Sequence, residues 1–187
     1  AAGAAACVAA IVGAAFGAVG DPENFDRVVD PVLFVSGLAV FAFAMRWDMA
    51  DPRRETRRAD VAFWLHLLAA PLIVHPIFSA IGVTEGAITV GGAVLVIALY
   101  IAMAGIALAI DRRALMVSSL VYVLFALNGL FDRFGAVETN VALAALVIGS
   151  ALLLLSAFWH NARAMIVRPL PEGLRIRLPV LDRPAAA

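Results

Sequence analysis

The sequence predicts an all-α protein of the polytopic membrane class, built as a bundle of six transmembrane helices. Of the 187 residues, 64% are hydrophobic and only 15% are charged, and the mean hydropathy is +0.97. This composition excludes an ordinary soluble globular domain. The apolar residues also gather in six runs of about 20 residues, the length that crosses the hydrocarbon core of a bilayer. These runs occupy residues 1–20, 31–47, 61–82, 87–110, 114–131 and 141–159.

The runs define a six-helix transmembrane domain over residues 1–168, followed by a cytoplasmic or interfacial tail over 169–187. The first run has neither a basic leader nor a small-x-small cleavage site, so we expect a membrane span there rather than a signal peptide. The single cysteine, Cys7, excludes a disulfide framework and a cysteine-rich metal site. Pro169 and Pro171 are expected to end the sixth helix, because proline cannot continue one.

Two Asp-Pro pairs predict where the second and third helices begin. Aspartate is a preferred N-cap residue, and proline is favoured at the first helical position. Asp30 and Pro31 therefore predict a helix start near Pro31, and Asp51 and Pro52 predict another at Pro52. The third helix would then carry residues 53–58 out of the membrane as a solvated extension with local ion pairs.

The arginines predict the orientation of the bundle. Every basic residue is an arginine, and all except Arg27 and Arg133 lie before the third span, before the fifth span or after the sixth. Basic residues in short loops are retained on the cytoplasmic side, which predicts that both termini are cytoplasmic. Three tryptophans fall at the same span ends, as an interfacial aromatic belt requires: Trp47, Trp64 and Trp159. We therefore expect a multi-pass protein of a bacterial inner (plasma) membrane.

The third span carries the most unusual polar residues. It holds His66 and His75 together with Pro71 and Pro76, whereas no carboxylate and no arginine is expected inside any span. Nine residues separate the two histidines, so they lie on opposite helix faces and cannot share one site. Each proline frees one backbone carbonyl and bends the helix.

Asn128, in the fifth span, is expected at about the same depth as His75. One interpretation is a small polar pocket for a ligand, formed by these two side chains beside Pro71 and Pro76. The other is an interhelical hydrogen bond, worth about 0.6 kcal/mol on average. The second interpretation is favoured, since polar groups between membrane helices commonly serve packing.

His66 and His160 lie toward the same predicted membrane surface and are the candidate axial ligands of a haem b. A dihaem arrangement needs four histidines, and this chain has three. His160 is better explained as an interfacial residue beside Trp159. We therefore predict no cofactor and no metal site, with haem as the alternative.

Small residues predict close helix packing. Gly13 and Gly17 form a GxxxG pair in the first span, and Gly149 lies on a small-residue face of the sixth. Such faces let helix backbones approach closely. Packing within the chain is the default expectation, and packing against another subunit is the alternative.

The end of the chain, SAFWHNARAMIV followed by LPEGLRIRLPV, resembles the tails of uncharacterised polytopic inner-membrane proteins of GC-rich bacteria. The resemblance covers about 40 residues, is low in specificity, and implies a location rather than an activity.

The sequence contains no Walker loop, HExxH, Gly-x-Ser-x-Gly or dinucleotide fingerprint, which favours a non-enzymatic protein. The five arginines in 46–60 are nearly neutralised by four acids, which argues against a nucleic-acid partner. The leading hypothesis is an accessory or scaffold subunit, whose partners are the lipid bilayer and other membrane subunits. The second is a small transporter or channel with a polar site near the third span, and the third is a haem- or quinone-binding protein.

Overall fold

The computed structural model describes residues 2–18, 25–82, 89–134 and 138–181, and over these ranges the chain forms helices and no strand. The all-α prediction is therefore confirmed for the described part of the chain. The helices are α1 (Ala2–Ala18), α2 (Phe25–Met49), α3 (Arg57–Ser79), α4 (Val90–Ile110), α5 (Ala114–Phe134), α6 (Glu138–Ala157), α7 (Trp159–Val167) and α8 (Glu172–Arg175).

Four or five of these elements are long and apolar enough to cross a membrane. The four single helices are Val28–Met49, Arg57–Ser79, Val90–Ile110 and Ala114–Phe131. A fifth candidate is the pair Val141–Ala157 and Trp159–Val167, which is bent by 75°. Helix α1, with 17 residues, is not among these candidates. The chain is thus a helical membrane bundle. The six spans predicted from the sequence are only partly supported.

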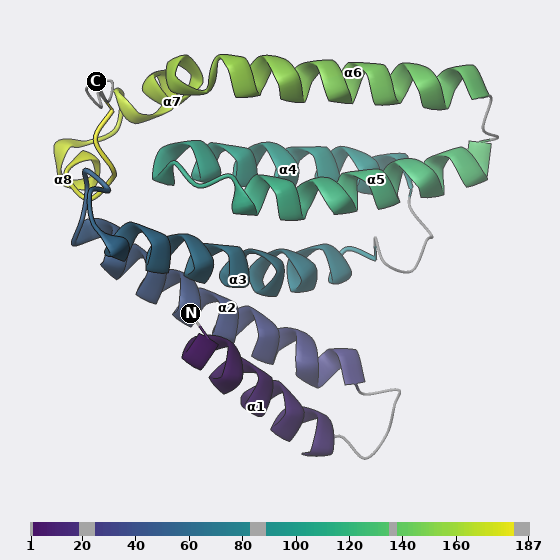
Figure 1. The fold of residues 1–187 in the computed structure, drawn as a ribbon. Helices are drawn as coiled ribbons and strands as arrows, with labels where there is room; N and C mark the ends of the chain where they lie inside the picture. The colour runs from purple at the N-terminus through teal and green to yellow at the C-terminus, as the bar shows by residue number, and fades with distance from the viewer. Residues whose placement is uncertain (1, 19–24, 83–88, 135–137, 182–187) are drawn as a thin grey trace.

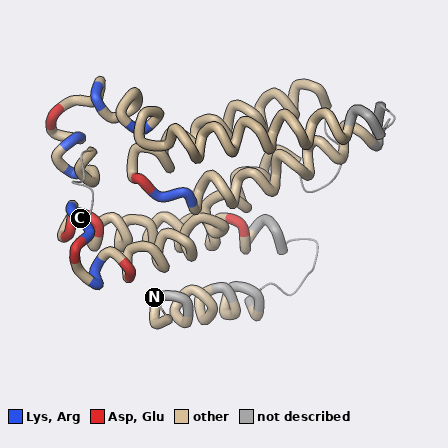
Figure 2. The backbone as a smooth tube through the Cα atoms, turned by 45° about the horizontal axis from the view of Figure 1, so that its top comes forward, with Lys and Arg blue, Asp and Glu red and all other residues tan. Residues whose placement is uncertain are grey.

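Successive helices from α2 to α6 run in alternating directions (Figure 1). This arrangement brings the α2–α3 connection, the α4–α5 connection, α7 and α8 to one end of the molecule. Most of the charged residues that the structure describes gather at that end (Figure 2). We call it the arginine end, and we call the opposite end, where α2 begins and α3 ends, the far end.

Helix α2 begins earlier than the sequence predicts. Its first residue is Phe25, so Pro31 lies inside the helix rather than at its start. A proline at this position removes one backbone hydrogen bond in the second turn of the helix. Because the loss is close to the helix start, the helix continues on both sides of Pro31. The prediction of a start near Pro31 is wrong, and Asp30 consequently belongs to the helix.

Helix α3 begins later than predicted, because Asp51 organises a turn instead of capping a helix at Pro52. Its carboxylate accepts hydrogen bonds from the amides of Glu55 and Thr56 at 3.2 and 2.9 Å, and from the Thr56 hydroxyl at 2.7 Å. The hydroxyl and these amides favour the charged carboxylate and lower the pKa of Asp51. Thr56 is the N-cap, and its oxygen accepts a bond from the amide of Arg58.

The expected sixth helix is broken at Phe158. Helix α6 ends at Ala157, and α7 continues at 75° to it from Trp159. The side chain of Trp159 is only 4% exposed, and its indole N–H donates to Asp111 at 2.7 Å. Because this contact holds the start of α7 against the end of α4, the chain turns toward the bundle before it reaches Pro169.

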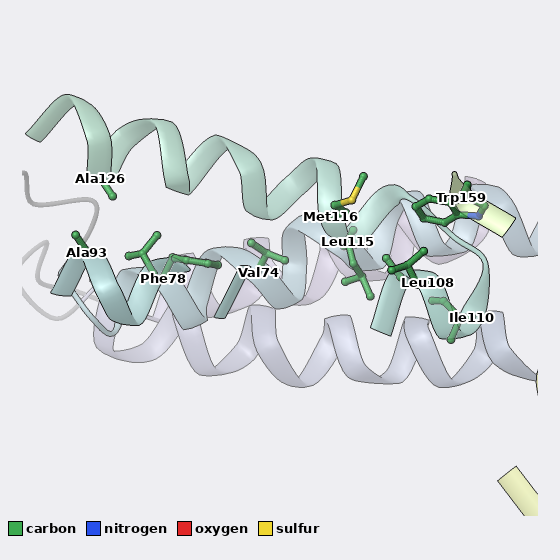
Figure 3. Close-up of a cluster of buried hydrophobic side chains, with 12 residues drawn as sticks. Val74, Phe78, Ala93, Leu108, Ile110, Leu115, Met116, Ala126 and Trp159 are labelled. Carbon is green, nitrogen blue, oxygen red and sulfur yellow. The ribbon is translucent and has the colours of Figure 1, made fainter. Parts of the chain in front are cut away.

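Helix α3 is the centre of the bundle, since it contributes to both hydrophobic clusters. One cluster joins α3, α4, α5 and α7 (Figure 3), and the other joins α1, α2 and α3. Helices α2 and α3 approach each other closely at Gly37 of α2. A Cβ atom added there would lie 2.9 Å from Ile73 Cγ1 and from the backbone carbon of Leu72. Glycine is therefore required where α2 crosses α3.

Candidate functional site

Two groups of polar residues lie between the helices, one at each end of the bundle. Asp30 and Asp48 both fall within the candidate span Val28–Met49. The sequence analysis placed the second span at residues 31–47, which leaves both carboxylates outside it, whereas the helix that could span the membrane is longer at both ends.

At the arginine end, Asp48 and Arg112 form a buried ion pair. Their side chains are 1% and 9% exposed, and the guanidinium binds both carboxylate oxygens, at 2.6 and 3.2 Å. The same guanidinium donates to the Ala59 carbonyl at 3.1 Å. Two-point binding by a planar guanidinium is the strongest arrangement of such a pair. The pair joins the end of α2 to the α4–α5 connection and to the first turn of α3.

Asp111 links three further parts of the arginine end. It is the C-cap of α4, with a left-handed backbone (φ 56°). Arg54, in the α2–α3 connection, binds its carboxylate at 2.9 Å and also donates to the carbonyls of Ile110 and Asp111. Arginine is favoured at a helix C-terminus, where unpaired carbonyls carry partial negative charge. Trp159 binds the other carboxylate oxygen.

Helix α7 and the tail complete this network. Arg163, 2% exposed, donates to the carbonyls of Pro179 and Val180. Arg113 lies over the Trp159 ring, with its guanidinium carbon 4.5 Å from the ring centre. The stretch at 46–60 is therefore only partly the solvated segment that was predicted: Arg53, Glu55 and Arg58 are exposed, whereas Asp48 and Arg54 pair with Arg112 and Asp111, about 60 positions away. The charged residues of this network pair with one another, and these contacts are suited to holding the connections at the arginine end together.

His66 lies beside this network and is buried, with 2% exposure. Its Nδ1 lies 2.8 Å from the Ala62 carbonyl, which can only accept, so Nδ1 carries the proton. The same nitrogen is 3.7 Å from Asp48, and the ring packs edge-on against Phe41. Its Nε2 is buried without a hydrogen-bond partner among the described residues.

At the far end, His75 connects three helices. Its Nδ1 lies 2.7 Å from the hydroxyl of Tyr122 on α5, and its Nε2 lies 4.0 Å from the carboxylate of Asp30 on α2. A nearby carboxylate favours a proton on Nε2, which leaves Nδ1 to accept the hydrogen bond from the tyrosine. Phe78 stacks on Tyr122, with ring centres 4.8 Å apart. This group can hold a proton or a positive charge next to Asp30.

The other residues predicted for the third-span site are distributed around His75. Pro76 is buried and lines a groove between α2 and α3, whereas Pro71 is exposed, and α3 remains helical through both prolines. Asn128 is exposed and lines a different groove, of 360 Å³, between α5 and α6. The pairing of His75 with Asn128 stays a prediction.

The candidate haem ligands differ in their surroundings. His66 is enclosed between α2 and α3, and His160 is exposed on α7. Nε2 of His66 is buried on α3, and His160 lies on a different helix, α7, so haem binding by these two residues stays a hypothesis.

The predicted small-residue faces are open. A Cβ atom added at Gly13, Gly17 or Gly149 would meet no described atom within 4 Å. On α1, the opposite side packs on α2 through Val8 and Ile11, which line the α1–α2 groove. The default expectation of close packing within the chain is not met among the described residues.

Comparison of the chain with models of known protein families, with curated proteins and with solved structures found no match. The functional argument therefore depends on the chain's own residues.

Three residues important to these sites were not found by sequence reasoning: Asp30, Tyr122 and Asp48. Asp30 was expected only as a helix cap before the second span, and both carboxylates lie outside residues 31–47, the range expected for that span. One feature of the sequence could have indicated Asp48. Arginines and acids occur together near the ends of the apolar runs, and a buried arginine such as Arg112 needs a carboxylate partner.

Proposed function

We propose that this chain is a non-enzymatic accessory or scaffold subunit of a membrane assembly, and that it spans a bacterial inner membrane six times. Helix α1 and the bent pair α6–α7 would add two spans to the four single helices. The arginine end would face the cytoplasm, because arginines in short connections are retained there. Both termini would then be cytoplasmic.

The orientation has a direct test in a Cys7→Ser background. A single cysteine at Thr84, between α3 and α4 in the sequence, should react with an impermeant thiol reagent in intact cells. Cysteines at the exposed positions Arg53 and Glu172, at the arginine end, should react only after the cells are lysed. Reaction of Arg53→Cys in intact cells, with Thr84→Cys protected, would reverse the proposed orientation.

The observation that carries the accessory role is the open GxxxG face of α1. Glycine in a helix interior costs roughly 0.5–1 kcal/mol relative to alanine, so it is favoured where a backbone must approach closely. Within the bundle, that close approach occurs at Gly37, whereas Gly13 and Gly17 point away from α2 into open space. A helix of another subunit is the partner that such a face fits.

Gly17→Leu should therefore displace a partner subunit while leaving the chain folded, because the added side chain meets no described atom of its own chain. The tagged full chain would be purified in mild detergent, and the masses of co-purifying chains would be compared with those of wild type. Partner recovery should fall at least tenfold.

Gly105→Leu is the matched control, since Gly105 also has open space around its Cβ position but lies on α4 outside any GxxxG pair. It should retain the partner. Full recovery of every partner by Gly17→Leu would count against this interface and against the accessory role based on it.

A second candidate function, a small transporter or channel, is favoured by one specific observation. His75, Asp30 and Tyr122 form a polar contact between three candidate spans, α2, α3 and α5. Ionisable residues between membrane helices often mark ion or substrate pathways. Haem or quinone binding is the third hypothesis, and a visible absorption spectrum of the purified protein tests the haem.

A further inference from the structure

The groove beside Asp30 has the features of a binding site. It lies at the far end between α2 and α3 and has a volume of 360 Å³, within the range of small-ligand pockets. Among the residues that the structure describes, Asp30 is the only charged one that lines this groove, and the other described walls are apolar or aromatic. The lining residues are Asp30, Pro31, Phe34, Pro76, Ile77 and Ala80.

Asp30 is partly removed from water, with its side chain 19% exposed. The cationic group that the structure places near it is the imidazole of His75, at 4.0 Å. This distance is too long for a direct hydrogen bond, so the imidazole neutralises Asp30 only by its charge when it is protonated. When His75 is neutral, the carboxylate retains its negative charge beside an open groove.

We propose that Asp30 and this groove bind a small organic ammonium ion, and that His75 makes the binding compete with a proton. Protonated His75 supplies the positive charge that Asp30 needs, and a bound ammonium supplies it instead when His75 is neutral. The hydroxyl of Tyr122 orients the imidazole through Nδ1 and leaves Nε2 facing Asp30. Proton binding at His75 therefore lowers the affinity for the cation by the same factor as cation binding lowers the affinity for the proton.

The chemistry of the walls selects the ligand class. Calcium takes six to eight oxygen ligands, and one carboxylate supplies too few. In the described part of the chain, no group of three or more His, Cys, Asp or Glu side chains is placed to hold a metal ion. Phe34 and the apolar walls suit alkyl groups, and an aromatic ring face attracts an ammonium charge.

The pH dependence has a defined origin. In the part of the chain that the structure describes, the titratable groups that face His75 are Asp30 from α2 and Tyr122 from α5. The described helix α4 carries no charged residue, and its one tyrosine is Tyr100. Imidazole is the side chain that changes charge near neutral pH. Cation binding should therefore be weaker under acidic conditions, where a protonated His75 competes for Asp30.

The test uses the full chain in detergent and tetraethylammonium, which has no titrating proton of its own. Binding is measured by equilibrium dialysis at pH 5.5 and pH 8. A proton bound at His75 competes with the probe for Asp30, so we expect binding to be about tenfold weaker at the lower pH. We expect this tenfold difference in wild type and its loss in His75→Gln, which binds the probe equally at both pH values.

Asp30→Asn should abolish binding at both pH values, and Glu55→Gln, which removes an exposed carboxylate at the arginine end, should bind as wild type does. Because Asp30→Asn also alters a helix contact, the pH response of His75→Gln provides the second, independent criterion. No binding by wild type, binding that survives Asp30→Asn, or equal displacement by sodium would overturn the proposal. These outcomes are separate from partner loss in Gly17→Leu, so the site and the accessory role are tested independently.

Discussion

Asp48→Ala should destabilise the folded chain by about 3–5 kcal/mol, the usual cost of removing one partner of a buried ion pair. Arg112 would keep its charge in a site where its side chain is 9% exposed, without the carboxylate that binds it at two points. The free energy of unfolding in mixed detergent and denaturing-surfactant micelles measures the effect. The same substitution should loosen the α2–α3 and α4–α5 connections together.

The double variant Asp48→Leu with Arg112→Met is the decisive comparison. Replacing both charges by apolar groups removes the unpaired charge, and such replacements are often neutral or stabilising. We expect the double variant to be at least 2 kcal/mol more stable than Asp48→Ala. Glu55→Gln, at an exposed position of the same end, should change stability by less than about 0.5 kcal/mol. Equal stability of Asp48→Ala and wild type would mean that the pair contributes nothing to the fold.

Gly37→Ala should cost about 1–3 kcal/mol, the usual penalty for overpacking a close contact. The new Cβ would lie 2.9 Å from the backbone carbon of Leu72, and a backbone atom cannot move aside as the end of a side chain can. Helices α2 and α3 would have to separate. Thermal unfolding in detergent, together with a crosslink between introduced cysteines on the two helices, measures stability and separation.

Gly105→Ala is the control for Gly37→Ala, because it makes the same chemical change in α4 with no described atom within 4 Å. Alanine is the better helix former, so this variant should be neutral or more stable by up to about 1 kcal/mol. Similar stability losses in the two variants would show that helix propensity or expression, rather than the α2–α3 contact, explains the result.

Parts of the fold could be predicted because they depend on local sequence. The apolar runs predicted helices that the structure contains, and four of them meet the length and hydropathy needed to span a membrane. Helix ends were predicted less well. Asp51 uses its carboxylate in the turn that leads to Thr56, and Trp159 turns the chain by binding Asp111, so contacts displaced both boundaries.

The candidate site could be predicted only in part. The sequence singled out His75, because histidine between two prolines is unusual inside a membrane span. It suggested Asn128 as a partner from depth alone, a pairing that stays a prediction, and it did not suggest Tyr122 and Asp30, which lie 2.7 and 4.0 Å from the imidazole. Depth along a helix can be counted from the sequence, but which face of α5 meets α3 depends on how the two helices rotate and pack.

By itself, the sequence determined that the chain is helical, that its apolar helices suit a bilayer, and that its arginines gather in a few connections. These properties follow from composition and spacing along one dimension. Only the tertiary structure decided that Asp48 meets Arg112 across 64 positions, that His75 faces Asp30, and that α2 and α3 approach closely at Gly37. Such pairings depend on the rotation, depth and crossing of helices, because a buried charge or a glycine acquires its role from the residue that packing places opposite it.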